Sequence, residues 1–248
     1  MRSENLQLLY CNFKRKMKFE LCVTDPKGIQ LAKKYKLDRI ELCMNLEQGG
    51  TTPSPALVHM ALNAGLETHA LIRPRAGGFV YSEAEKELIL AEIHALKYLG
   101  VHGFVVGTLK ENKEIDTTLI GEIAKISKGK TLTFHRAFEE MGEWQDGVEV
   151  LKFFRFKRVL TAGRAANVDL GFENLKEIKA VFGSDLELMT GGGVHEKNIS
   201  NLIKELRPDA VHFSASSIIL DTNSMFGGKR MEINENRLVS ILKAATGI

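Results

Sequence analysis

Histidines, glutamates and arginines recur at alternate positions of short apolar segments, and these residue types can move protons and bind anions. Residues 131–138 show the pattern most clearly, because Thr133 and His135 share one face while apolar residues share the other. A histidine near its ordinary pKa can act as a general acid or base, with a carboxylate as its partner. We therefore take Glu20, Glu41 and His135 as candidate catalytic residues.

Segments of two kinds alternate along the chain and would position these side chains. Apolar alternation predicts eight strands, at 18–23, 39–43, 68–73, 103–107, 130–135, 158–161, 187–190 and 210–214. Capping residues and helical spacing predict a helix after each strand, at 25–35, 52–65, 82–99, 116–127, 144–154, 170–182, 195–206 and 234–245. Such units predict a parallel sheet, and eight of them favour an α/β single-domain (β/α)8 TIM barrel. The first βα turn lacks a Gly-rich nucleotide fingerprint, which weakens the alternative of an open doubly wound sheet.

A barrel strand directs alternate side chains inward. One parity rule places the following residues inside: Glu20, Cys22, Glu41, Cys43, His69, Leu71, Arg73, Thr133, His135, His212 and Ser214. Burying a carboxylate costs several kcal/mol unless it is paired. Two inward glutamates with Arg73 could therefore be a purely structural pair. The alternative is a functional site, because polar residues at the carboxyl ends of barrel strands usually mark it.

Two loops predict an anion-binding pocket. Gly-rich and Ser-rich turns follow the seventh and eighth predicted strands, where barrels of this type often bind phosphate through backbone N–H groups. Guanidinium groups add donors suited to phosphate and carboxylate. The candidate anion-binding residues are Arg73, Arg75, Arg136, Gly192, Gly193, His212, Ser214 and Ser216. The glycines could instead only make tight corners, and Arg75 and Arg136 could be loop and surface charges.

Three cysteines, Cys11, Cys22 and Cys43, form no CxxC motif, and their odd number argues against a disulfide framework. Cys22 and Cys43 have the same parity on adjacent predicted strands, which lie about 4.8 Å apart. A free cysteine on a buried strand is usually a small hydrophobe, so packing alone could account for the pair.

Composition narrows the classes of partner. The 248 residues carry a net charge of only +3 and no basic stripe with exposed aromatics, which argues against nucleic-acid binding. No apolar run approaches the ~20 residues of a membrane span, and the first residues lack the apolar core of a signal peptide. We expect a cytoplasmic protein, with residues 1–16 a flexible extension dispensable for folding and residues 17–248 the barrel.

Several stretches together resemble the copper homeostasis family CutC. They are Glu20–Val23, Arg39–Cys43, Gly49–Ser54, Ile72–Arg75 with Tyr81–Ser82, Thr133–Phe138, Arg158–Thr161, Gly191–Val194 with Asn198, and His212. The resemblance implies a cytoplasmic TIM barrel, commonly a homodimer or higher homo-oligomer, and a Cu(I) site at Cys22 and Cys43. The chain departs from the family pattern where Gly78 and Glu139 replace aspartates and Ala162 replaces a serine.

Three functions remain open. The first is copper homeostasis through Cu(I) binding. The second is lyase-like or isomerase-like acid–base chemistry on a small anionic or phosphorylated substrate. No inward lysine supports a Schiff-base aldolase, and no HxH or HExxH motif supports a zinc hydrolase. The third is a ligand-binding or regulatory barrel without chemistry, which the departure at Gly78 leaves open.

Overall fold

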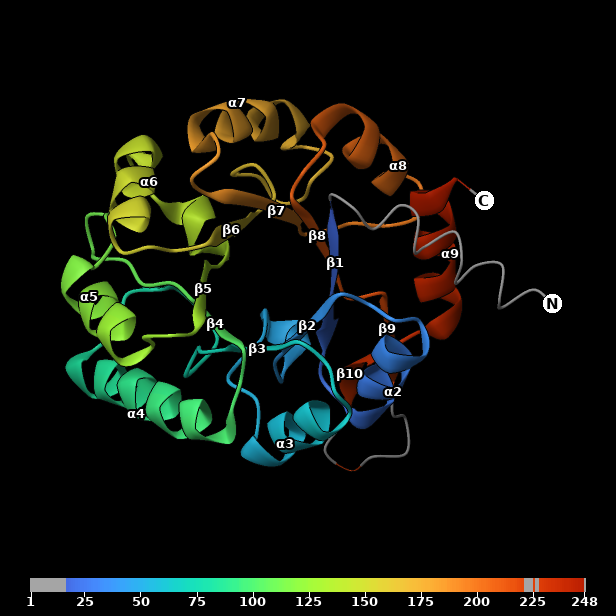
Figure 1. Ribbon diagram of the computed structural model, residues 1–248, viewed down its shortest axis with the longest axis horizontal. Coiled ribbons are helices and arrows are strands. Elements are labelled where there is room, and N and C mark those ends of the chain that lie inside the picture. The colour runs from blue at the N-terminus through green and yellow to red at the C-terminus, as the bar shows by residue number, and fades with distance from the viewer. Residues whose placement is uncertain (1–16, 221–224, 226–227, 248) are drawn as a thin grey trace.

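A closed barrel of eight parallel strands forms the centre of the protein. The computed structural model describes residues 17–220, 225 and 228–247 (Figure 1). The strands are β1 (Lys18–Val23), β2 (Arg39–Leu42), β3 (Thr68–Leu71), β4 (Gly103–Val106), β5 (Thr131–Phe134), β6 (Arg158–Thr161), β7 (Glu187–Gly191) and β8 (Ala210–Phe213). Each strand pairs with the next, and β8 returns to β1. The predicted (β/α)8 barrel is confirmed, whereas the predicted extension at 1–16 lies outside the described residues.

Helices surround the barrel in Figure 1. They are α2 (Pro26–Lys34), α3 (Pro55–Asn63), α4 (Glu83–Leu99), α5 (Thr117–Ile126), α6 (Trp144–Phe153), α7 (Phe172–Phe182), α8 (Ile199–Asn201) and α9 (Glu235–Thr246). Local chemistry sets several starts: the Asp25 carboxylate accepts the N–H of Gly28 at 2.8 Å, and Ser82 forms a capping box with Glu85. No helix within the described ranges has the length and apolarity to cross a membrane.

The main apolar core lies between the strands and the helices. Outward-facing side chains such as Ile40 and Phe104 are fully buried there, together with Ile93 of α4 and Ile120 of α5. This burial removes apolar surface from water on the outer face of every strand. The inner face is consequently left to the alternate, largely polar positions.

Two segments differ from the expected pattern. The chain between β8 and α9 forms an antiparallel hairpin of β9 (Ser216–Leu220) and β10 (Lys229–Ile233), which the strand–helix alternation did not predict. The expected helix at 195–206 is a short α8 followed by a π-helix at Leu202–Leu206. Two short 3-10 helices, η1 (Leu46–Gln48) and η2 (Arg136–Glu140), follow β2 and β5. The hairpin, η1 and η2 all contribute residues to the barrel mouth.

Candidate functional site

The deep interior of the barrel holds a layer of paired charges. Glu20 on β1 is fully buried beside the guanidinium of Arg39, its register partner on β2. On its other side His212 of β8 lies in register with Glu20 and places Nδ1 2.8 Å from its Oε1. Burial alone would raise the pKa of Glu20, but Arg39 and His212 hold it well below its ordinary value. Glu20 is therefore a carboxylate that orients His212.

Arg158 continues this layer on the opposite wall. Its guanidinium lies 3.1 Å from the Glu187 carboxylate, 3.2 Å from Thr133 Oγ1 and 3.5 Å from His69 Nδ1. Burial lowers the pKa of His69, although the contact with Glu67 opposes the shift. We call these residues the inner charge layer: Glu20, Arg39, Glu67, His69, Thr133, Arg158 and Glu187. Its charges stabilise one another, so the layer is largely structural.

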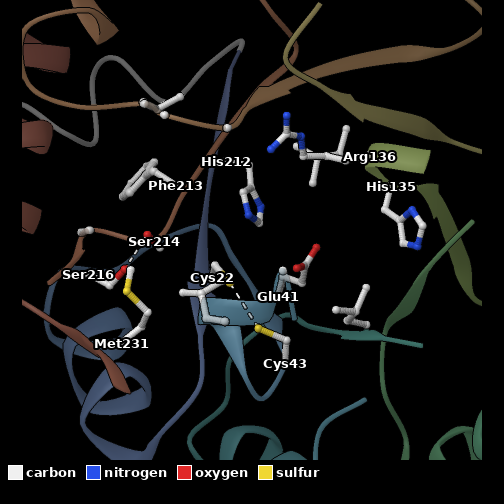
Figure 2. A pocket seen from close by; sticks show the side chains of 18 of the residues that line it. Cys22, Glu41, Cys43, His135, Arg136, His212, Phe213, Ser214, Ser216 and Met231 are labelled. Atoms are coloured by element: carbon white, nitrogen blue, oxygen red, sulfur yellow. Dashed lines mark hydrogen bonds between the residues drawn. The ribbon is translucent and has the colours of Figure 1, made fainter. Parts of the chain in front are cut away.

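Above this layer a cavity of about 610 Å³ opens at the carboxyl ends of the strands (Figure 2). All of the candidate residues line it except Glu20, which lies beneath, and Arg75, which lies in the loop before α4. We call this space the mouth cavity. Most of the residues that strand alternation and the loop patterns singled out therefore lie around one space, and the roles proposed for them stay predictions.

Glu41 is the buried carboxylate of the mouth cavity. It is 5% exposed, and its Oε2 has no hydrogen-bond partner among the described residues. Burial raises the pKa of Glu41 to about 7, so it exchanges a proton near neutrality. Burial lowers the pKa of His212, but the charge of Glu41 and the bond to Glu20 outweigh this effect and raise it. Figure 2 shows the Glu41 carboxylate between the imidazoles of His212 and His135.

His135 lies on the far wall of the same cavity. Its Nδ1 accepts the N–H of Ala137 at 3.0 Å, and its ring packs 4.8 Å from the ring of Phe79. Burial and the charge of Arg73 lower the pKa of His135 to about 3. The imidazole is thus neutral with its proton on Nε2, which has no acceptor among the described residues. An acid–base role for His135 remains a prediction, and this geometry favours a neutral hydrogen-bond donor.

The two strand-end cysteines meet at the near wall. Their Sγ atoms lie 3.4 Å apart, and Cys22 and Cys43 are 4% and 0% exposed. The hydrogen bond between them, together with burial, raises the pKa of the Cys22 thiol well above its ordinary value. A Glu41 carboxylate oxygen and both Sγ atoms all lie within 4.8 Å of one another. A second such group joins Glu20, Glu41 and His212.

The arginines are engaged by the protein itself. Arg73 donates to the carbonyls of Gln48, Gly50 and Gly77, which joins the loops after β2 and β3. Arg75 pairs with Glu85 of α4, outside the cavity. These contacts engage both guanidinium groups without a ligand, which weakens their assignment as anion donors, although Arg73 Nε has no hydrogen-bond partner among the described residues.

Arg136 lines the mouth cavity and pairs with Glu139 at 3.3 Å. Its Nη2 also donates to the carbonyls of Ala165 and Ala166. Glu139 in turn accepts the N–H groups of Ala162 and Arg164, at 2.6 and 2.7 Å. A glutamate at this position therefore joins η2 to the end of β6.

The turn after β7 follows the expected glycine geometry. Gly192 and Gly193 have φ values of 100° and 81°, which side chains rarely adopt. The hydroxyls of Ser214 and Ser216 lie 2.8 Å apart at the end of β8. Anion binding by this group stays a prediction.

Several residues of the barrel interior and the mouth cavity were not among the candidates from the sequence. Arg39 and Arg158 have the same inward parity as the chosen candidates, so the alternation could have identified them. Met231 and Arg237 line the mouth cavity from the segment after β8. Only knowledge of the β9–β10 hairpin could have brought them to the site.

The comparisons with known proteins fit this geometry. The profile of the CutC family matches residues 17–217. The chain belongs to the CutC family. It is 36% identical over 203 residues to a CutC family protein of Bacteroides fragilis, covering 81% of each chain. A relative from Rhizobium meliloti is 33% identical over 202 residues, with 82% of each chain covered.

Solved structures extend the comparison. The copper homeostasis protein CutC from Streptococcus agalactiae superposes with a TM-score of 0.74 at 28% identity, covering 79% of this chain and 97% of that one. Phosphoribosylanthranilate isomerase from Thermotoga maritima reaches a TM-score of 0.58 at 15% identity, covering 94% of this chain and all of the other. The second similarity concerns the barrel fold alone.

Proposed function

We propose that this CutC family member binds Cu(I) as cargo in the cytoplasm, through the thiolates of Cys22 and Cys43. The observation that carries the proposal is the 3.4 Å separation of two buried Sγ atoms on the wall of one cavity. Thiolates are the side chains with the strongest preference for Cu(I). The description of the Streptococcus agalactiae relative as a copper homeostasis protein supports the choice of metal.

The thiol spacing also predicts the coordination. With metal–sulfur bonds of about 2.3 Å, two sulfurs 3.4 Å apart subtend an angle of about 95° at the ion. For linear coordination, the two sulfurs would have to move apart by about 1 Å from their present distance. A bent pair leaves room for a third donor, and the Glu41 carboxylate is close enough to provide it. We therefore expect either a two-coordinate ion after a small side-chain movement or a three-coordinate ion with Glu41.

Proton release follows from burial of the thiols. The raised pKa of Cys22 keeps it protonated at neutral pH, so Cu(I) must displace its proton. The affinity should rise with pH, by about tenfold per pH unit for each proton released.

A competition titration tests the proposal. Reduced protein is titrated anaerobically with Cu(I) against a chromogenic chelator, and the Cys22→Ser/Cys43→Ser variant is compared with Cys11→Ser as the matched control. We expect the double variant to lose about a hundredfold in affinity and the control to lose none. Equal affinities in all three proteins would exclude the cysteine pair.

Acid–base catalysis is a second candidate function, favoured by a specific observation. Glu41 and the Glu20-oriented His212 share the cavity with the neutral donor His135. Such a group could move a proton beside a carbonyl while His135 Nε2–H stabilises the developing oxyanion. A small anionic substrate and lyase-like or isomerase-like chemistry would fit. The likeness to the isomerase adds nothing here beyond the fold.

A ligand screen separates this candidate from a barrel that only binds. Thermal shifts are measured with small carboxylates and sugar phosphates, and the ligands that bind are followed by NMR for turnover or for exchange of carbon-bound protons. Glu41→Gln and His212→Asn should abolish exchange while ligand binding persists. Binding without exchange in the wild-type protein would instead assign a ligand-binding role.

We also propose that the protein is a homodimer or a higher homo-oligomer, as the family resemblance implies. Light scattering coupled to size-exclusion chromatography checks this. A monomer at micromolar concentration would contradict it.

A further inference from the structure

A second recess adjoins the mouth cavity on its outer side. It has a volume of about 430 Å³, and Leu46 and Met231 line both spaces. The recess lies between the start of α2, the η1 segment and strand β10, which packs against η1. The outer recess and the cavity that holds the thiol pair therefore share part of their lining.

Two methionines line this outer recess. Met44 directly follows Cys43 and is 39% exposed, held by backbone bonds to Thr51 at 2.8 and 2.9 Å. Met231 is half-buried on β10, and Figure 2 shows it beyond Cys22, on the opposite side of the mouth cavity from His135. Neither side chain belongs to the apolar core of the described residues. Core packing therefore does not account for the two thioethers.

Thioethers are soft, uncharged ligands that bind Cu(I) without losing a proton. The charges around the recess are largely paired with one another: Glu232 lies 2.8 Å from Lys27 and 3.4 Å from Arg230, and Asp25 caps α2. Hard cations, which need several free oxygen ligands, gain little in such a place. Glu47 and Asn45 add oxygen atoms to the lining, but the soft donors there are the two thioethers.

We propose that Met44 and Met231 form a labile entry site that passes Cu(I) to Cys22 and Cys43. The inference rests on the proposed copper function. The ion stays Cu(I) throughout: two Cu–thioether bonds break, two Cu–thiolate bonds form, and the two thiol protons leave to solvent. Since the thiols are almost fully buried, a solvent-accessible first ligand would raise the rate of loading without changing the final affinity. Met44 lies within the family-matched residues 17–217, whereas Met231 lies beyond them.

Loading kinetics test the role of the two sulfurs. Met44→Leu, Met231→Leu and the double variant keep the side-chain volume and remove the sulfur. Cu(I) transfer from a chelator complex is followed by stopped flow, with Met60→Leu on α3 as the matched control, since Met60 is 47% exposed and outside both spaces. We expect the double variant to load about tenfold more slowly at unchanged affinity. Unchanged loading rates would overturn the inference and leave the cysteine site intact.

A second measurement keeps the two proposals distinguishable. Ag(I), a soft ion without redox chemistry here, is added to ¹³C-methyl-methionine protein carrying Cys22→Ser/Cys43→Ser. The methyl signals of Met44 and Met231 should shift while that of Met60 does not. If these shifts occur but the competition titration gives equal Cu(I) affinities in all three proteins, the proposed function is refuted and the thioether site is retained. Absence of shifts at both methionines would refute the thioether site itself.

Discussion

The pKa values of two glutamates on neighbouring strands are shifted in opposite directions. Glu20 and Glu41 are 0% and 5% exposed, and both face the barrel interior. Glu20 lies in the inner charge layer, where Arg39 and His212 hold its pKa well below the ordinary value. Glu41 lies one layer nearer the mouth without a directly paired cation, and burial raises its pKa to about 7. Depth along the barrel therefore separates a carboxylate that stays ionised from one whose pKa lies near neutrality.

The same division extends to the surrounding residues. The inner charge layer is closed by ion pairs across adjacent strands, such as Arg158 with Glu187. Within the described residues, the mouth cavity keeps polar atoms without hydrogen bonds on Glu41, Arg73 and His135. Arg39 Nη1 and His69 Nε2 of the inner charge layer also lack hydrogen bonds, but they lie 3.8 and 3.4 Å from the Glu67 carboxylate. Unsatisfied buried polar atoms cost free energy, so these atoms are candidates for contact with a ligand or with water.

Breaking the inner pair should have the largest effect. Arg39→Met leaves the buried Glu20 carboxylate without its cation, and we expect a loss of about 3–5 kcal/mol in the free energy of unfolding. Urea denaturation measures it. The Glu20→Gln/Arg39→Met double variant removes both charges and should recover a large part of the loss. A single variant as stable as wild type would show that the layer is not structural.

Replacing each glutamate by glutamine should change the free energy of unfolding in opposite directions at neutral pH and above. Because folding raises the pKa of Glu41 from 4.5 to about 7, the folded state binds its proton more tightly, and wild-type stability falls between these pH values. Glu41→Gln should gain on the order of 3 kcal/mol at pH 8 and nothing below pH 4.

Glu20→Gln provides the contrast. Its lowered pKa contributes stability above pH ~4.5 that is lost as the pH falls, so this variant should be destabilised at neutral pH. Urea unfolding at a series of pH values measures both variants. Parallel curves for the two variants would contradict the distinction between the layers.

A methyl group at Gly107, the residue after β4, should displace the side chain of His135. A Cβ there would overlap the imidazole of His135, which cannot retreat because it packs on Phe79. We expect Gly107→Ala to cost about 1–3 kcal/mol in thermal or urea unfolding. The same substitution in a His135→Ala background should cost less. An equal cost in both backgrounds would mean that the ring is not the obstacle.

Arg75 should give the smallest effect. Its ion pair with Glu85 is partly exposed, so Arg75→Ala is expected to change the free energy of unfolding by less than about 1 kcal/mol. Ligand and Cu(I) affinities should stay at the wild-type value, whereas Arg136→Ala at the cavity wall should alter anion affinity. Isothermal titration with phosphate compares them. If Arg75→Ala loses anion binding and Arg136→Ala does not, Arg75 is an anion-binding residue after all.

The periodicity of the sequence was sufficient to predict the barrel. A strand's two faces are encoded by alternate residues, so Glu41, Cys43 and His135 could be placed inside without any knowledge of their neighbours. The Asp25 and Ser82 caps likewise depend only on residues three positions away. Strand ends were misplaced by one or two residues because fraying depends on tertiary contacts.

Tertiary structure alone decided which inward residues interact. The pairing of Glu20 with Arg39 and His212 depends on the register of three separate strands, β1, β2 and β8, which parity does not specify. The carbonyls that engage Arg73 lie in two separate loops, and Met231 reaches the mouth only through the β9–β10 hairpin. The alternation of residues along each strand specifies which side chains face inward. The closed barrel determined how deep each one lies, and that depth sets the burial and the charges that distinguish Glu20 from Glu41.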